Sequence, residues 1–101
     1  MATLNIALQE GFDGDLVLIK VNDLEVFRKD DVKTKRLLDL AEEFERQVPD
    51  GPVKLEVLLP KRNLHGKTEV QALQKIYVGI SVSVSGPSID FIISQKPFGY
   101  A

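Results

Sequence analysis

One histidine and two pairs of aspartates are the residues of this sequence that come nearest to a reactive site. Asp13 and Asp15 flank Gly14 in a glycine-rich turn, and Asp30 and Asp31 are expected at a nearby strand end. Oxygen-rich loops with a glycine can hold calcium, because a hard cation needs about six to eight oxygen ligands around a sharp turn. Two local carboxylates fall short of that set, and their spacing differs from that of the calcium-binding loop of EF-hand proteins. We therefore expect a solvated turn and no metal site.

His65 lies in the segment Asn63–Lys67, whose composition is that of a loop. Nucleophilic catalysis would require this histidine beside a serine and a carboxylate, and no serine stands in a Gly-x-Ser-x-Gly elbow. The absence of cysteine excludes a cysteine nucleophile. We therefore expect no catalytic residue, no cofactor-binding residue and no cofactor. The alternative is a small metal-dependent or hydrolytic protein that uses His65 with Asp13 and Asp15.

Two aromatic residues near the C-terminus are the remaining candidates for function. Phe98 and Tyr100 stand in the segment Gln95–Ala101, which contains Pro97 and Gly99 and is predicted to be irregular. Aromatic side chains offer a large contact area with few rotors, so they could contact a protein partner. The other interpretation, which we favour, is that the tail folds back onto its own domain.

Composition and charge exclude several classes of protein. The chain has 101 residues, 44% of them hydrophobic, and a formal net charge of -2. Nucleic-acid binding requires clustered Lys and Arg, so none is expected. Membrane binding is not expected either, since no apolar stretch approaches the roughly 20 residues that span a bilayer. The N-terminus lacks the pattern of a secretion signal, which predicts a soluble cytoplasmic protein. A mature secreted chain is the alternative.

Apolar and polar residues alternate through much of the chain, as they do in half-buried strands. The alternation is complete over Ile76–Val84, and Leu16–Val21 is apolar on both faces, as a central strand would be. Asn22 and Asp23 join that run to the next one in a tight hairpin. Further strands are predicted over Thr3–Gln9, Leu24–Phe27, Val53–Leu59, Thr68–Leu73 and Ile89–Ile93, with loops over Gly11–Asp15 and Lys61–Lys67.

The segment Val32–Val48 permits two interpretations. Apolar residues at helical spacing predict one amphipathic helix that Thr34 could cap; these are Leu37, Leu40, Ala41, Phe44 and Val48. The rival prediction is two strands, over Thr34–Leu40 and Phe44–Val48.

A family resemblance favours the two strands. The run from Thr34 through Phe44-Glu45-Arg46-Gln47-Val48, Pro49-Asp50-Gly51 and the alternating Val53–Val57 resembles transthyretin-like and carboxypeptidase-regulatory-like β-sandwiches. Those domains have a threonine, a strand that carries an aromatic residue, a Pro-x-Gly turn and an alternating strand. The sequence departs from the pattern at Ala41-Glu42-Glu43, where the family usually has a glycine. The resemblance implies a fold and transfers no site residue.

Together these observations predict an all-β protein. We expect a single domain over residues 1–101, an Ig-like or transthyretin-like antiparallel sandwich of about seven or eight strands in two sheets, with an irregular tail over 95–101. The alternative is an α+β fold with one helix near residues 33–47. A non-catalytic binding or structural module is the favoured function. Its protein partner, or a second copy of the chain, would bind through a sheet edge or the C-terminal tail.

Overall fold

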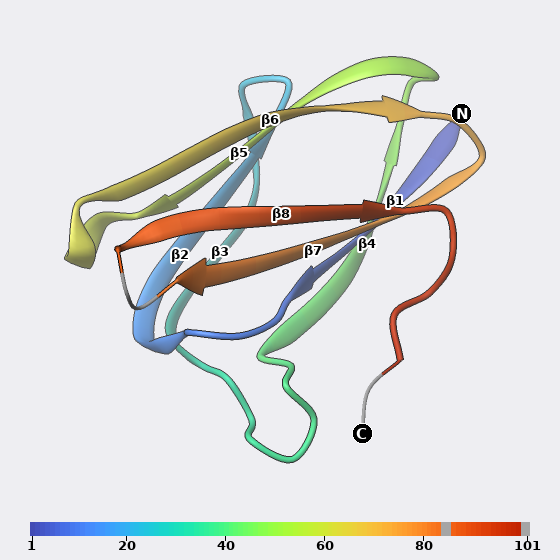
Figure 1. Cartoon of the computed structure of the whole chain (residues 1–101). Helices are drawn as coiled ribbons and strands as arrows, with labels where there is room; N and C mark the ends of the chain where they lie inside the picture. The colour runs from blue at the N-terminus through green and yellow to red at the C-terminus, as the bar shows by residue number, and fades with distance from the viewer. Residues whose placement is uncertain (84–85, 100–101) are drawn as a thin grey trace.

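The computed structural model describes residues 1–83 and 86–99, and these form a sandwich of two sheets (Figure 1). One sheet has the strand order β4-β1-β7-β8 and the other β3-β2-β5-β6. Strands β1 and β7 are parallel, and every other pair is antiparallel. The strands are β1 (Ala2–Leu8), β2 (Asp13–Val21), β3 (Leu24–Lys33), β4 (Glu42–Val48), β5 (Gly51–Leu59), β6 (Leu64–Ala72), β7 (Lys75–Ser83) and β8 (Ser88–Ser94).

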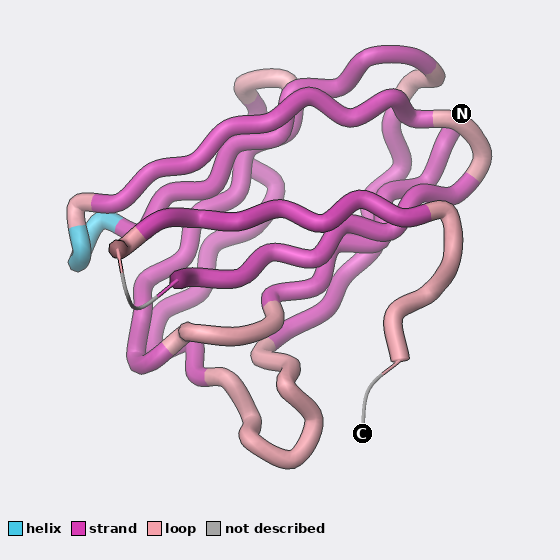
Figure 2. The backbone as a smooth tube through the Cα atoms, in the orientation of Figure 1, coloured by secondary structure: helices cyan, strands magenta, loops and turns pink. Residues whose placement is uncertain are grey.

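The all-β prediction is confirmed, and the helical alternative is wrong. Within the described residues the only helical segment is a short 3-10 turn, Pro60–Arg62, between β5 and β6 (Figure 2). No described helix is long and apolar enough to cross a membrane.

The hydrophobic core lies between the two sheets and follows the predicted alternation. Every second residue of β7 points inward, so that Ile80 and Val82 are buried as expected. The inward side chains of β1 sit beside those of β7 in register, with Ile6 opposite Val78. Branched aliphatic side chains from both sheets fill the space between them. These side chains favour strands because they pack well on a half-buried, pleated surface. Val84, the last residue of the predicted strand, lies outside the described residues.

The predicted hairpin turn between β2 and β3 is confirmed. Asn22 and Asp23 both have positive φ, at 50° and 69°. A two-residue loop of this conformation matches the right-handed twist of the strands that it joins, and Asn and Asp tolerate it better than most residues. The side chain of Asn22 also accepts a hydrogen bond from the Lys54 backbone, which ties the turn to β5.

The prediction for residues 34–40 is wrong, because this segment is neither helix nor strand. Strand β3 continues to Lys33, and the chain then forms a projecting loop closed by a single bridge between Lys35 and Leu40. Leu37, which belonged to the helical stripe, is 88% exposed. The second predicted strand, Phe44–Val48, is confirmed as part of β4.

Thr34 fixes the start of this loop. Its hydroxyl accepts a hydrogen bond from the Phe12 backbone at 3.1 Å and donates one to the Gln9 carbonyl at 2.7 Å. These contacts hold the projecting loop against the connection between β1 and β2.

Two predicted loops are shorter than expected. Asp13 and Asp15 belong to β2, which begins before the predicted start at Leu16. Residues 64–67 belong to β6, so His65 lies on a strand. The reason is the tight turn at Asn63, whose left-handed conformation returns the chain at once to pair with β5.

Candidate functional site

In the predicted aspartate loop, Asp15 forms a buried ion pair that links two elements of the fold; we call this pair with Arg62 the Asp15 clamp. Asp15 is buried, with 2% of its surface exposed, and both of its carboxylate oxygens accept hydrogen bonds from Arg62 at 2.7 Å. The same guanidinium donates to the Gly11 carbonyl at 2.8 Å, and Asp15 also accepts from the Asp13 backbone. A bidentate arginine–carboxylate pair is strong and geometrically specific. It fixes the start of β2 to the turn after β5.

Two other aspartates of the predicted cluster also face cations. Asp30 lies 2.7 Å from the Lys61 ammonium, and Asp31 lies 3.7 Å from that of Lys33. The hydrogen bond from Lys61 lowers the pKa of Asp30 below its ordinary value, with a further contribution from the Asp31 backbone N–H. No described residues form a group of three or more His, Asp or Glu side chains that could hold a metal ion. The structure therefore brings three of the four aspartates to lysine and arginine partners.

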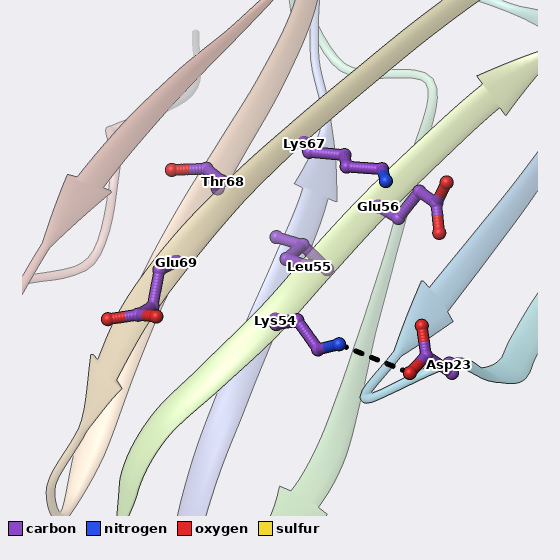
Figure 3. Close-up of a pocket in the computed structure, with 7 residues that line it drawn as sticks. All are labelled: Asp23, Lys54, Leu55, Glu56, Lys67, Thr68 and Glu69. Carbon is purple, nitrogen blue, oxygen red and sulfur yellow. Dashed lines mark hydrogen bonds and ion pairs between the residues drawn. The ribbon is translucent and has the colours of Figure 1, made fainter.

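His65 is exposed on β6 and contacts Glu56 of β5 at 2.5 Å. This pair lies on the outer face of its sheet, beside a shallow depression of about 270 Å³ (Figure 3). The depression carries charges of both signs from neighbouring strands, and Lys54 forms an exposed ion pair with Asp23 at its rim. Such a surface resembles a solvated sheet face with cross-strand pairs more than a desolvated reaction site.

A second charged group lies on the outer face of the other sheet. The Lys75 ammonium contacts Glu45 at 2.7 Å and stands 5.4 Å from the centre of the Tyr77 ring. Its hydrogen bond lowers the pKa of Glu45, with a smaller contribution from the Asn5 amide, while Glu45 raises the pKa of Lys75. The buried Oδ1 of Asn5 has no hydrogen-bond partner among the described residues.

Of the two aromatic candidates in the tail, Phe98 is described and Tyr100 lies outside the described residues. Phe98 is half-buried and lines a depression on the molecular surface with residues that include Gln9, Ser81 and Ile92. The described part of the tail is irregular, as predicted. Its role as a partner contact stays a prediction.

Strand β8 forms an apolar edge of its sheet. The search of the sequence for reactive and aromatic residues did not identify it as a candidate site. It pairs with β7 on one side and, within residues 1–83 and 86–99, with no strand on the other. Ile92 and Ile93 are 54% and 47% exposed, although they are adjacent and point to opposite faces. Of its seven residues only Asp90 is charged. The alternation of residues 89–93 predicted the strand, but not that it ends the sheet.

The direction of the backbone groups on β8 follows from the neighbouring strand. On β7, the Ile80 carbonyl accepts from the Gln9 N–H and the Val82 N–H donates to the Glu10 carbonyl, so these residues face the β1 side. The intervening residues of β7 therefore face β8, since backbone polar groups alternate along a strand. Gly79 and Ser81 are opposite Ile92 and Asp90. The N–H and C=O groups that point to the open side are thus those of Ile89, Phe91 and Ile93.

Comparisons with known proteins give no match to this chain among protein-family models, curated proteins or solved structures. The function of the chain is therefore inferred from the geometry of the molecule itself.

Proposed function

We propose that this chain is a non-catalytic interaction module that binds an extended segment of another polypeptide at the open edge of β8. The observation that carries the proposal is the row of backbone donors and acceptors on Ile89, Phe91 and Ile93, next to the exposed side chains of Ile92 and Ile93. Strand addition to a sheet edge takes its affinity from main-chain hydrogen bonds and its specificity from alternate side chains.

The pairing of the aspartates supports this function over the metal-dependent or hydrolytic alternative. Asp15 is engaged by Arg62, and Asp30 by Lys61. A cation would have to displace these partners before it could bind the carboxylates. His65 in turn contacts Glu56 on an open sheet face.

We also propose the finer classification of the sandwich as transthyretin-like. The support for this classification is local. The resemblance implies a strand that carries an aromatic residue, a Pro-x-Gly turn and an alternating strand, and these correspond to β4, Pro49-Asp50-Gly51 and β5. Gly51 has φ of 111°, a conformation that favours glycine and accounts for its place in the Pro-x-Gly turn.

A strand peptide tests the proposed edge. In protein labelled with nitrogen-15 and held at about 10 μM, a seven-residue peptide of alternating Thr and Val at about 1 mM should shift the amide resonances of Ile89, Phe91 and Ile93. The matched control is the same peptide with alternate amides N-methylated, which removes the donors of one edge and should abolish the shifts.

A variant of the protein provides the second arm. Ile93→Pro removes one donor from the open edge and leaves the pairing with β7 intact, because Pro is tolerated where the N–H faces solvent. It should weaken the peptide's effect several-fold. Equal shifts with both peptides, or none with either, would contradict the proposed function.

A further inference from the structure

The four edge strands of the sandwich differ in how they are protected against pairing with another strand. Strand β3 is irregular, with register shifts along its pairing with β2, and carries six charged residues in the run Glu25–Lys33, namely Glu25, Arg28, Lys29, Asp30, Asp31 and Lys33. Strand β4 has Glu42, Glu43, Glu45 and Arg46 among its seven residues, and β6 carries His65, Lys67 and Glu69. Charges and bulges are the usual means of protecting an edge. Strand β8 has a regular register and a single charge, so it is the least protected of the four.

We propose that the occupant of this edge is β8 of a second copy of the chain, paired antiparallel about a two-fold axis that passes between the two Ile92 residues. This inference rests on the proposed function and names the partner. The axis makes the interface isologous, so each copy supplies both the donors and the acceptors. Phe91 of one copy then pairs with Ile93 of the other, and each such pair exchanges both of its backbone hydrogen bonds.

The side chains favour this register over the two that are centred on Asp90 and on Phe91. An axis at Asp90 would set two carboxylates directly opposite each other, which is destabilising. An axis at Phe91 would set each Ile92 against the Asp90 of the other copy. The axis at Ile92 sets the two exposed Ile92 side chains together and Ile93 against Phe91, so both exposed isoleucines gain an apolar neighbour.

The position of β6 favours the same register. At the Ile89 end, β6 approaches β8 so closely that a Cβ on Gly66 would lie 2.8 Å from the Cβ of Ile89. The exposed large apolar side chains of β8 lie at the opposite end, at Ile92 and Ile93. An axis at Ile92 keeps the second copy at that open end.

Charge complementarity argues for a second copy in particular. In this register Asp90 is opposite Ser94 of the second copy, the last residue of β8, and Lys96 of that copy follows two residues later in the bend after the strand. Lys96 forms no ion pair with another described residue. The one charge on β8 is thus brought to the end of a strand that a lysine of opposite charge follows closely. Since a single pair of short strands buries less than a standard interface, we expect a dimer that forms with rising concentration.

Engineered cysteines test the register directly, because the native chain has none. In the Ile92→Cys variant the introduced thiols would form a non-hydrogen-bonded pair with Cα atoms about 4.5 Å apart, within the range of a disulfide. Mild oxidation should give a covalent dimer on a non-reducing gel. Asp90→Cys tests the rival register, and Leu24→Cys, at a similarly exposed position on the other sheet, gives the background from random collision. Equal cross-linking of all three variants would overturn the inference.

Sedimentation equilibrium from about 10 μM to about 1 mM tests the association itself. The native chain should shift from monomer towards dimer, Ile92→Lys should stay monomeric, and Leu24→Lys should behave as the native chain. If the native chain is monomeric throughout and Ile92→Cys does not cross-link, the inference is wrong. The proposed function would still stand if the strand peptide shifts the edge amides, and would fall with it if the peptide does not.

Discussion

At the scale of single residues, the pair formed by Asp15 and Arg62 is the contact whose loss should matter most. Asp15→Asn keeps the size of the side chain but leaves the guanidinium without its counter-charge in a partly buried place. Breaking such a pair from one side costs about 3–5 kcal/mol when it is fully buried, and the 29% exposure of Arg62 reduces that figure to about 2–4 kcal/mol. Urea unfolding followed by fluorescence or circular dichroism measures the loss.

The matched control is the exposed pair of Asp23 and Lys54, at 3.2 Å. Asp23→Asn should change the free energy of unfolding by less than about 1 kcal/mol, as exposed pairs do. Similar losses in the two variants would show that burial of Asp15 does not carry the effect.

The sequence could not have revealed the Asp15 clamp. Asp15 and Arg62 are 47 positions apart, and Arg62 stood in a segment predicted as a loop. Local spacing predicts what neighbours along the chain can do, whereas this contact depends on β2 lying beside the turn that follows β5. The sequence analysis considered the aspartates because their carboxylates could bind a metal ion. The role of Asp15 in the structure depends instead on Arg62, which pairs with it.

At the scale of elements, Gly66 is the residue that allows β6 and β8 to approach each other across the sandwich. A Cβ there would meet the Ile89 side chain at 2.8 Å and the Phe91 ring at 3.3 Å. Gly66→Ala should therefore force the strands apart and lower the free energy of unfolding by about 1–3 kcal/mol. Gly86→Ala is the control, since no atom of its surroundings lies within 4 Å of an added Cβ. Thermal melts of the two variants give the comparison, and a more stable Gly66→Ala protein would contradict this account.

Strands were predictable where one face is apolar over a full run, and were missed where small or charged residues interrupt it. Alternation correctly predicted β7 and β5, whose inward residues are large and aliphatic. It missed the start of β6, where the inward-facing positions include Gly66. Leu37 and Leu40 matched a helical stripe, but β3 and Thr34 hold that segment away from the core, so local propensity gave way to tertiary contacts.

At the scale of the whole molecule, composition and alternation were enough to predict two packed sheets but not the order of the strands. The parallel pairing of β1 with β7 joins residues more than seventy positions apart, and nothing local in either strand specifies it. That pairing places β8 at the end of its sheet. The proposed binding edge is therefore a property of topology, which is why a search for reactive residues passed over it.

The C-terminal tail joins the rest of the molecule at Phe98. Phe98 is half-buried in a depression that Gln9 and Ile92 also line, so the described part of the tail lies against the outer face of its own sheet. Removal of residues 97–101 should therefore lower the free energy of unfolding by about 1–3 kcal/mol, the range for exposing one well-packed aromatic side chain. Phe98→Ala in the full-length chain should reproduce most of that loss, and thermal melts at about 5 μM keep self-association from contributing.

An unchanged melt together with weaker dimerisation would instead make the tail a contact for the second copy, through its position beside Ile92. If both the melt and the dimerisation are unchanged, Phe98 has neither role.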